Sequence, residues 1–334
     1  MEQSPLQPTP VGAFRFNTDS SKMEYYDGNQ WVNITSDSPD AQTGGTRGLV
    51  MGGYQSPANV DIIEYINTST TANAVDFGNM TGNIKNVAAV ASRTRGLAGG
   101  GYTGSDVNTI QAVTIATLGD AVDVGDLSVT RRAAAPMGNS TRGLFAGGAT
   151  PSASDVIDYV TIASAGDAKD FGNLSTATYI AAGCSSPTRG LFGGGNPGLN
   201  TIEYVTISTL GNAADFGDLS GGGRRGNSGS SNAVRGIWGG GVPSPSKIDY
   251  STIASLGNSV DFGDYVNDHT WLYTSMSSPI RALFVGGYNP STNASYNTID
   301  YFQIMTIGNS IDFGDLTAAR HDLSGLSNGN GGLG

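Results

Sequence analysis

Short apolar runs, separated by polar or glycine-rich turns, recur along the chain with a nearly constant period. The run TRGLFAGG at residues 141–148 returns in related form from residues 46, 94, 188, 234 and 280, so the six copies begin 48, 47, 47, 46 and 46 residues apart. Helical spacing of apolar residues is not sustained, and several runs are apolar at successive positions, as in strands buried on both faces. A fixed period of this length indicates an array of similar β-units.

Each copy divides into the same four short segments. In the third copy these are TRGLFAGG, DVIDYVTI, DAKDFGNLS and ATYIAAGCSS, joined by polar turns. Four short strands make one blade of a β-propeller, and six copies fall within the roughly 4 to 8 blades that propellers use. We therefore predict an all-β protein in which residues 46–334 form a six-bladed propeller, with blades that start near residues 46, 94, 141, 188, 234 and 280.

The two ends of the array predict how the ring closes. The first copy has no evident innermost strand before Thr46. The segment ARHDLSGLSNGN, which follows the last copy, aligns with RRAAAPMGNS after Leu127. We predict that residues 320–329 supply the innermost strand of the first blade, because this pairing removes the free edges on which an open sheet aggregates.

A different pattern precedes the array. Residues 1–36 read as an extended arm followed by a small β-meander, in which Asp27-Gly28 is a strong hairpin signal, and residues 37–45 read as a linker. Two or three strands are not stable alone, so this segment needs a surface to dock on, either the main domain or another chain. The aromatic residues predicted to make that attachment are Phe14, Phe16, Tyr25, Tyr26 and Trp31.

The composition of the chain limits which partners and which locations we expect. The formal net charge of -11 argues against nucleic acid as a partner, since that affinity comes largely from Lys and Arg. No apolar run reaches the roughly 20 residues that span a bilayer, and no signal peptide opens the chain, so we expect a soluble cytoplasmic product without membrane insertion. The single cysteine, Cys184, excludes an intrachain disulfide and is predicted to be buried.

The chemistry that the sequence could support is limited. A D-F-G triplet or a variant occurs six times, which favours a turn whose aspartate caps backbone N–H groups or pairs with the recurring arginine; calcium binding by these aspartates is the alternative. Two histidines, His269 and His321, are too few for a histidine-rich metal centre, and both are predicted to lie at the surface. We expect no catalytic residues, no metal and no cofactor, and therefore no enzyme; a carbohydrate-active propeller enzyme is the alternative.

Variation between the copies predicts where ligands bind. Connections from the second to the third strand, and from a fourth strand to the next copy, emerge on one face of a blade and differ strongly, whereas the opposite connections are nearly uniform. The candidate binding face comprises the aromatic and basic residues of the variable connections: Tyr54, Tyr102, Arg131, Arg132, Tyr179, Arg224, Arg225, Lys247, Tyr288 and Tyr296. Trp271 and Tyr273 are assigned to an innermost strand and predicted to line the channel.

The repeats resemble known families. A double glycine ends the second strand and an acidic-aromatic pair such as Asp158-Tyr159 opens the third, as in kelch repeats, although Gln111-Ala112 replaces that pair in the second copy and the kelch tryptophan is missing. The consensus over residues 46–328 resembles repeats of marine phage and cyanophage virion proteins. The segment GAFRFNTD…EYYDGNQW at residues 12–31 resembles a motif of phage tail fibres.

These resemblances imply a non-enzymatic virion structural protein that is assembled in the host cytoplasm. A tail fibre or tail appendage would act in assembly and host attachment, with other virion proteins as partners of the N-terminal segment and a host-surface glycan or protein as the recognised ligand. A capsid or neck decoration protein is the close alternative. An intracellular kelch-type adaptor is disfavoured, because no partner-recruiting helical domain is present in the sequence.

Overall fold

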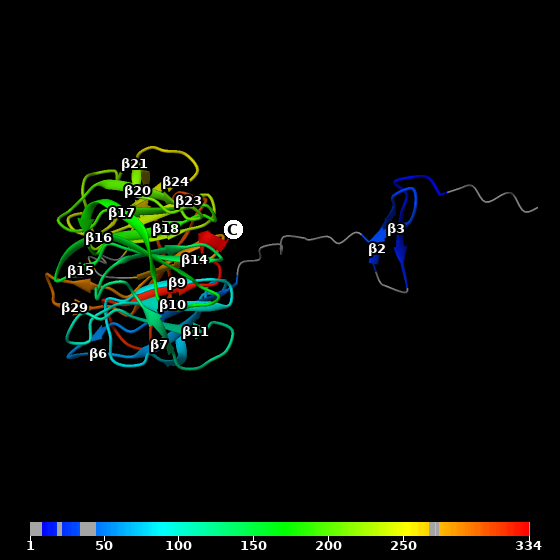
Figure 1. Ribbon diagram of the computed structural model, residues 1–334. Helices are drawn as coiled ribbons and strands as arrows, with labels where there is room; N and C mark the ends of the chain where they lie inside the picture. The colour runs from blue at the N-terminus through cyan, green and yellow to red at the C-terminus, as the bar shows by residue number, and fades with distance from the viewer. Residues whose placement is uncertain (1–8, 19–21, 34–44, 267–270, 272–273, 334) are drawn as a thin grey trace, which may run out of the picture. The chain divides into compact units, whose positions relative to one another are not determined.

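The computed structural model describes residues 9–18, 22–33, 45–266, 271 and 274–333. The chain divides into two compact units, residues 1–43 and 44–334 (Figure 1). Regular structure in the described part of both units consists of β-strands, apart from one 3₁₀ turn, η1 (Gly331–Leu333).

The smaller unit is an antiparallel sheet of three strands in the order β1 (Phe14–Asn17), β2 (Lys22–Tyr26) and β3 (Trp31–Asn33). The predicted turn at Asp27-Gly28 joins β2 to β3. Gly28 has φ 102°, and the Asp27 carboxylate accepts hydrogen bonds from the N–H groups of Gln30 at 2.7 Å and Asn29 at 2.8 Å. These hydrogen bonds, that from Gln30 above all, lower the pKa of Asp27.

The two faces of this sheet differ in character. Phe14 pairs with Tyr25 and Phe16 with Met23, which places all four on one face, and all four side chains are exposed. On the other face Arg15 forms an ion pair with Glu24 at 2.7 Å and lies over the ring of Trp31, whose centroid is 5.5 Å from that of Tyr26.

The five residues predicted to make the attachment lie on both faces of this sheet. Phe14, Phe16 and Tyr25 lie on the open apolar face, where Met23 joins them. Tyr26 and Trp31 lie on the opposite face, half-buried in a cluster within the sheet.

The larger unit contains one antiparallel sheet for each repeat; the sheets have four strands, except that of repeat 3, which has a fifth short strand. In repeats 2 to 6 the four main strands follow one another in sequential order from the innermost outward. Repeat 2 supplies β9 (Ala88–Ala91), β10 (Arg95–Gly99), β11 (Thr109–Thr114) and β12 (Val122–Asp126). Repeat 3 supplies β13 (Ala135–Gly138), β14 (Arg142–Ala146), β16 (Ser152–Thr161) and β17 (Lys169–Thr178), with β15 (Ala149–Thr150) as an added short strand.

The sheets of repeats 4, 5 and 6 follow the same plan. Repeat 4 contains β18 (Ala182–Ser185), β19 (Arg189–Gly193), β20 (Thr201–Thr206) and β21 (Ala214–Asp218). Repeat 5 contains β22 (Ser228–Ser231), β23 (Arg235–Gly239), β24 (Lys247–Thr252) and β25 (Val260–Asp264). Repeat 6 contains β26 (Thr274–Ser277), β27 (Arg281–Val285), β30 (Thr298–Gln303) and β31 (Ile311–Asp315), and the hairpin β28 (Tyr288–Asn289)–β29 (Ala294–Ser295).

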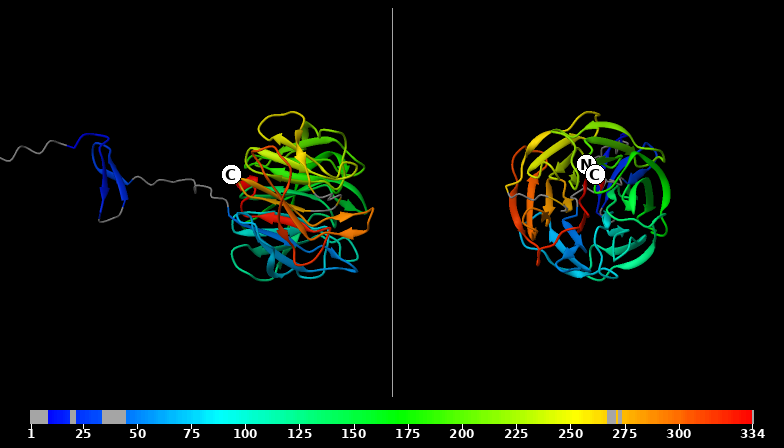
Figure 2. Two further views of the ribbon diagram at one scale, coloured as in Figure 1. Left: turned by 180° about the vertical axis from the view of Figure 1, so that it is seen from behind. Right: turned by 90° about the vertical axis from the view of Figure 1, so that its left-hand side faces the viewer.

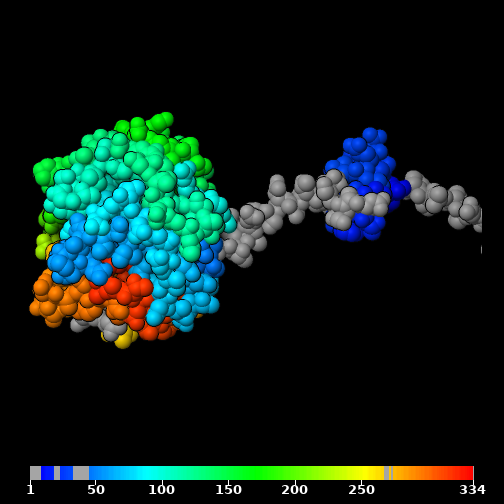
Figure 3. All heavy atoms as spheres, turned by 90° about the horizontal axis from the view of Figure 1, so that it is seen from below, coloured from blue at the N-terminus to red at the C-terminus, as the bar shows by residue number. Residues whose placement is uncertain are grey.

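The sheet of repeat 1 joins strands from both ends of this unit. The first repeat supplies three of its strands, β4 (Arg47–Met51), β7 (Ile62–Asn67) and β8 (Val75–Asn79). The fourth, β32 (Ser324–Ser327), comes from the end of the chain and pairs antiparallel with β4 from Ser324↔Met51 to Ser327↔Gly48. A short hairpin, β5 (Tyr54–Gln55)–β6 (Ala58–Asn59), follows β4. The predicted pairing of the 320–329 segment with the first repeat is thus present. Figure 3 shows residues near the end of the chain, in red, packed beside the first repeat, in blue.

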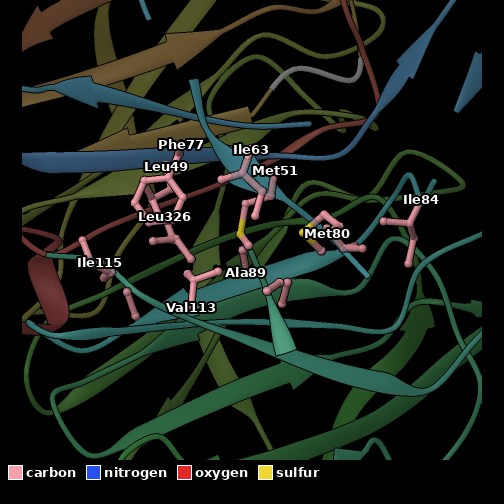
Figure 4. Packing of buried hydrophobic residues seen from close by; sticks show 14 residues of the cluster. Leu49, Met51, Ile63, Phe77, Met80, Ile84, Ala89, Val113, Ile115 and Leu326 are labelled. Carbon is pink, nitrogen blue, oxygen red and sulfur yellow. The ribbon is translucent and has the colours of Figure 1, made fainter. Parts of the chain in front are cut away.

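The sheets pack face to face about a common axis, an arrangement typical of a propeller (Figure 2). Innermost strands contact one another in the order β9, β13, β18, β22, β26, β32 and back to β9. Each hydrophobic cluster lies between neighbouring sheets: Leu49, Phe77 and Leu326 of the first sheet pack with Ala89 and Val113 of the second (Figure 4). This two-sided burial explains why β4 and its equivalents are apolar at successive positions rather than alternately.

The D-F-G triplet serves the contact between sheets. Gly172, at φ 149°, approaches the next repeat so closely that a Cβ atom there would lie 2.4 Å from the carbonyl oxygen of Gly211. Beside it, Asn212 Oδ1 accepts a hydrogen bond from the Asn173 N–H group at 3.0 Å. The aspartate has a local role: in repeat 2, Asp123 accepts a hydrogen bond from the Gly125 N–H group at 3.2 Å.

The recurring arginine links neighbouring sheets through carbonyl groups. Arg142 lies over the ring of Tyr159 at 4.9 Å and donates to the Ile207 carbonyl of the next repeat at 2.9 Å. The equivalent arginines donate to carbonyls of the next repeat in the same way; they are Arg47, Arg95, Arg189, Arg235 and Arg281. The alternative expectation, that this arginine pairs with the triplet's aspartate, is wrong for the described residues, because the guanidinium group is engaged by the carbonyl oxygen and, except in Arg95, by a tyrosine ring.

Candidate binding face

We use the name variable face for one end of the larger unit. At this end emerge the connections from second to third strands and the connections between repeats. Around its centre, the residue at one equivalent position of the connections between repeats adopts a left-handed conformation wherever the structure describes that position. The described members of this mouth ring are Asn86, Ala133, Ile180, Gly226 and Asp322, with φ between 50° and 67°. Their backbones are joined in sequence: the N–H group of Asn86 donates to Asp322, that of Ala133 to Asn86, that of Ile180 to Ala133 and that of Gly226 to Ile180, all at 2.8 to 3.0 Å. The mouth ring is therefore held rigidly by the backbone itself.

A second ring, the outer ring, surrounds the mouth ring. Its members each precede a mouth-ring position in the chain: Lys85, Arg132, Tyr179, Arg225, Trp271 and His321. Backbone bridges fix them to the residue that follows the double glycine of the same repeat, for example Lys85 to Tyr102, Trp271 to Tyr288 and His321 to Tyr54. Four cationic or titratable residues and two aromatic ones thus stand at one level around the axis.

Side chains of neighbouring repeats stack on one another in the outer ring. Arg132 lies 5.3 Å from the ring centroid of Tyr102, and Lys85 lies 5.0 Å from that of Tyr54. Arg225 lies 5.4 Å from the ring centroid of Trp271. These side chains are half-buried and held against a neighbouring repeat, so a ligand would meet a preorganised surface rather than mobile side chains.

The cations of the outer ring differ in how far they are neutralised. Lys85 Nζ lies 3.0 Å from Asp322 Oδ2, and Arg132 lies 2.5 Å from Asp106 Oδ1. Arg225 donates to the amide oxygen of Asn196 at 3.4 Å, and within the described ranges it has no carboxylate partner. Arg225 is therefore the guanidinium group best placed to accept an anionic or hydroxyl-bearing ligand.

Two of the predicted binding residues are buried structural residues. Arg131 donates to Asp158 at 2.8 Å and to the carbonyl groups of Phe145, Gly147 and Val156 at 2.8 to 3.1 Å, with no exposed surface. Arg224 forms the equivalent buried pair with Asp249, as does Arg320 with Glu64. Burial lowers the pKa of Arg131 and raises that of Asp249, in each case against the attraction of the partner. Arg131 and Arg224 are corrected from ligand contacts to anchors of the connections between repeats.

The remaining predicted residues take different positions. Tyr54, Tyr102, Arg132, Tyr179, Arg225 and Tyr288 lie in or against the outer ring. Trp271 belongs to the outer ring, before β26, and not to an innermost strand as predicted. Lys247, at the start of β24, lies 4.0 Å from Asp249, and the Tyr296 hydroxyl accepts a hydrogen bond from Asn289 at 3.3 Å. Tyr273 and His269 lie outside the described residues.

Sequence reasoning missed several residues of these rings: Lys85, Asn86, His321 and Asp322. The signal was present in the repeat itself. Lys85 and His321 occupy the same repeat position as Arg132, Tyr179 and Arg225, whereas the conspicuous Arg-Arg pairs led to the prediction of both residues of each pair, the buried one included.

His321 is not the surface residue that the sequence predicts. Its ring lies between Tyr54 and Tyr288, with centroids 5.2 and 4.7 Å away, and its side chain is only 12% exposed. Nδ1 lies 2.9 Å from Ser295 Oγ, but Nε2 lies 4.0 Å from Asp322 Oδ2, too far for a hydrogen bond, and that oxygen pairs with Lys85. The three residues therefore do not have the geometry of a Ser-His-Asp triad.

We expect His321 to make the stability of the protein depend on pH. Burial lowers the pKa of His321, helped by Lys85 and opposed by Asp322. As the pH falls, His321 is protonated in the unfolded chain before it is protonated in the folded protein. The contribution of neutral His321 to the free energy of unfolding is therefore complete above its pKa in the unfolded chain, about 6.5, and is lost as the pH falls through its pKa in the folded protein. Urea unfolding of the wild type and of His321→Gln should show a stability difference that shrinks from pH 7.5 to pH 5. An unchanged difference, or an NMR titration of His321 above 6.5, would contradict this expectation.

Ile180 is the strained member of the mouth ring. Its φ of 50° is costly for a β-branched residue, by about 1 to 3 kcal/mol, whereas glycine occupies the equivalent position at Gly226 without strain. Ile180→Gly should therefore unfold at higher temperature than the wild type, while the control Val160→Gly, in β16, should unfold at lower temperature because that side chain is buried. Lower stability of Ile180→Gly would show that the isoleucine side chain contributes more than its backbone strain costs.

A channel lined by the six innermost strands lies beneath the mouth ring. Its cavity measures about 160 Å³ and is bounded by small residues, among them Ser185, Ser231 and Ser327. Serine hydroxyls join adjacent strands across the wall: Ser185 Oγ donates to the Gly138 carbonyl and Ser231 Oγ to the Ser185 carbonyl, both at 2.7 Å. A polar cavity of this size can hold several water molecules.

η1 covers the end of the channel away from the variable face. Gly331, Gly332 and Leu333 are buried there, and Arg93 donates to the Leu333 carbonyl at 3.1 Å. Cys184, in the channel wall, is buried as predicted, and burial raises the pKa of its thiol.

Among the residues with described positions, no group of three or more His, Cys, Asp or Glu side chains is arranged to hold a metal ion. Nor does that part of the chain contain a helix of the length and hydropathy that crossing a membrane requires. Compared with known proteins, the sequence matches no protein-family model and no curated protein.

Proposed function

We propose that this chain is a non-enzymatic structural protein of a bacteriophage particle that recognises the host surface through its variable face. In this proposal residues 46–334 form a six-bladed, kelch-like propeller closed by β32, and the N-terminal sheet attaches it to a neighbouring virion protein. A tail fibre or tail appendage is the favoured location, and a capsid or neck decoration is the alternative. Assembly takes place in the host cytoplasm.

Contacts between the last and first repeats support the closed ring of six. Arg281 of repeat 6 donates to the Ser69 carbonyl of repeat 1 at 2.9 Å, repeating the link that each earlier arginine makes to its successor. Asp315 donates its N–H group to Asn73 Oδ1 at 3.0 Å, the equivalent of the Asn173–Asn212 contact. Two contacts that recur between neighbouring repeats therefore also join repeat 6 to repeat 1.

The outer ring is the observation that carries the recognition role. In a protein of net charge -11, it gathers Lys85, Arg132 and Arg225 with tyrosine and tryptophan side chains on one face. Aromatic and guanidinium groups that are already held in place lose little entropy on binding, and such residues dominate recognition surfaces. A host-surface glycan, with hydroxyl and carboxylate groups, or a host-surface protein fits this chemistry.

The virion role is supported by two resemblances and by the N-terminal sheet. The repeat consensus resembles phage virion proteins, and residues 12–31 resemble a tail-fibre motif. That segment exposes Phe14 and Phe16 by 67% and 57% on one face of a sheet too small to be stable without a partner. A neighbouring virion subunit would supply that partner.

Two experiments test the proposal. Mass spectrometry of purified virions should detect the chain, and its absence would end the structural assignment. The purified protein should bind host cells, and Arg225→Ala should weaken binding by about tenfold, the loss of roughly 1.4 kcal/mol. Lys169→Ala removes an exposed charge from the other end of the molecule and is the matched control. Equal binding by both variants would exclude the outer ring as the recognition site, and turnover of a glycan would favour the carbohydrate-active enzyme instead.

A further inference from the structure

Glu203, in β20, is a buried acidic residue that no lysine, arginine or histidine of the described residues neutralises. It is 8% exposed, and Oε1 accepts a hydrogen bond from the Ser175 N–H group at 3.0 Å. Within the described part of the chain, no group donates a hydrogen bond to Oε2. An ionised carboxylate is costly to bury unless a cation or further hydrogen-bond donors compensate its charge.

The same position in repeats 1, 2, 3 and 5 carries either a paired acid or a neutral residue. In three of these repeats an arginine of the connection that leads into the sheet pairs with the acid: Arg131 with Asp158, Arg224 with Asp249 and Arg320 with Glu64. In repeat 2 the acid is replaced by Gln111, which accepts a hydrogen bond from the Thr81 N–H group at 2.8 Å, and the arginine is replaced by Ile84. Repeat 4 keeps the acid but lacks the arginine.

Thr178 occupies the arginine's position in the connection that leads into repeat 4. Its carbonyl oxygen accepts a hydrogen bond from the Gly148 N–H group at 2.8 Å, and Arg131 accepts one from the equivalent glycine of its own neighbour at 2.9 Å. Thr178 Oγ1 donates to the Asn196 carbonyl at 3.0 Å, so its one proton is not available to Glu203. The threonine therefore supplies neither the charge nor the donors of an arginine.

A small cavity is lined by both Thr178 and Glu203. It measures about 20 Å³, large enough for at least one water-sized occupant. The same cavity is also lined by three residues of β19, β20 and the segment between them: Phe192, Gly194 and Thr201.

These three residues have equivalents that bind a cation in repeat 3. Phe192 lies opposite Glu203 as Phe145 lies opposite Asp158, and Gly194 donates to Thr201 as Gly147 donates to Val156. In repeat 3 the carbonyl oxygens that accept hydrogen bonds from the Arg131 guanidinium group are those of Phe145, Gly147 and Val156. One carboxylate and three carbonyl groups that hold a guanidinium group in repeat 3 thus have equivalents around the cavity of repeat 4.

We propose that this cavity binds a monovalent metal cation, Na⁺ or K⁺, which takes the place of the arginine. Such hard cations bind to carboxylate and carbonyl oxygens, and one carboxylate balances a single positive charge. Calcium would need about six to eight oxygen ligands, and Glu203 is the one acidic residue in the described wall of the cavity. The ion would hold the connection that presents Tyr179 in the outer ring, as Arg131 holds the connection that presents Arg132.

Thermal unfolding of the full-length protein in different chloride salts tests this site. At equal ionic strength, NaCl or KCl should raise the melting temperature above that in tetramethylammonium chloride, whose cation is too large for the cavity. An ion at ten times its dissociation constant should give a rise of about 3 °C. The protein should also broaden the ²³Na NMR line, and competition by K⁺ shows which of the two ions binds more tightly.

Two variants copy the solutions of other repeats. Glu203→Gln introduces the neutral residue of repeat 2, and Thr178→Arg introduces the cation of repeat 3. Both should lose the salt-specific rise in melting temperature, and Thr178→Arg should melt near the temperature of the ion-saturated wild type. Asp215→Asn removes an exposed carboxylate from the same repeat and is the matched control, which should keep the rise.

The alternative occupant is a water molecule beside a protonated Glu203. Equal melting temperatures of the wild type in all three salts, without broadening of the ²³Na line, would show this occupant and overturn the inference. A rise that Glu203→Gln retains would place the ion elsewhere, and a rise produced by calcium chloride alone would exclude a monovalent ion. None of these measurements involves host binding by Arg225, so this inference and the proposed function can fail separately.

Discussion

Removal of residues 318–334 is expected to unfold the larger unit at room temperature. The deletion takes away β32, which leaves the β4 edge of the first sheet unpaired, and it removes Leu323, Leu326 and Leu333 from the core. At about 1.5 to 3 kcal/mol for each buried side chain, these three alone contribute roughly 5 to 9 kcal/mol. Glu64 would also lose Arg320 and remain as a buried, unpaired charge, at a cost of about 3 to 5 kcal/mol.

The combined loss of free energy from the three leucines and the unpaired Glu64 is comparable with the whole stability of a typical protein, about 5 to 15 kcal/mol. The truncated chain should therefore lack a cooperative thermal transition or aggregate through its free edge, as measured by circular dichroism and light scattering. Deletion of residues 1–43, which form a separate unit, is the control and should leave the main transition in place. A truncated chain that melts like the full-length protein would show that β32 does not complete the first sheet.

Arg131→Met is expected to lower the free energy of unfolding by about 3 to 5 kcal/mol, because it leaves the carboxylate of Asp158 buried without its counter-charge. Three carbonyl groups, of Phe145, Gly147 and Val156, lose their donor as well. For a unit of this size the loss corresponds to a fall of about 10 °C in melting temperature.

The adjacent residue provides the control for this prediction. Arg132→Met removes a partly exposed ion pair with Asp106 and should cost less than about 1 kcal/mol. The double variant Arg131→Met/Asp158→Leu should recover part of the stability, because no charge is then left buried alone. Equal effects of Arg131→Met and Arg132→Met in thermal and urea unfolding would contradict the different burial of the two side chains.

Those features of the fold that recur in every copy of the repeat were predictable from the sequence. Four strands in each copy, and the pairing of the 320–329 segment with the first repeat, follow from comparing copies, and the structure contains both. The roles of the D-F-G glycine and the recurring arginine were not predictable in this way. Gly172 is required by the carbonyl oxygen of Gly211, and Arg142 by that of Ile207, and both oxygens belong to the next repeat in space.

At the candidate binding face, too, the sequence predicted one part and only the structure decided the rest. Sequence reasoning placed the aromatic and basic residues in the variable connections, but it could not separate Arg131 from Arg132. Tertiary contacts distinguish them: Arg131 pairs with Asp158 in the interior, whereas Arg132, next to its backbone bridge with Ala149, stays partly exposed. His321 likewise becomes buried only because Tyr54 of the first repeat and Tyr288 of the sixth meet around it.

By itself, the sequence determined the strand content, the period and the face on which variation is concentrated, because each depends on local pattern repeated six times. The tertiary structure alone decided which charged groups are buried and which side chains form the rings around the mouth. These properties depend on partners from other repeats, as in the pair of Arg320 with Glu64, which lies 256 residues away in the sequence. Burial and electrostatic environment are set by such distant contacts, and a local pattern does not contain them.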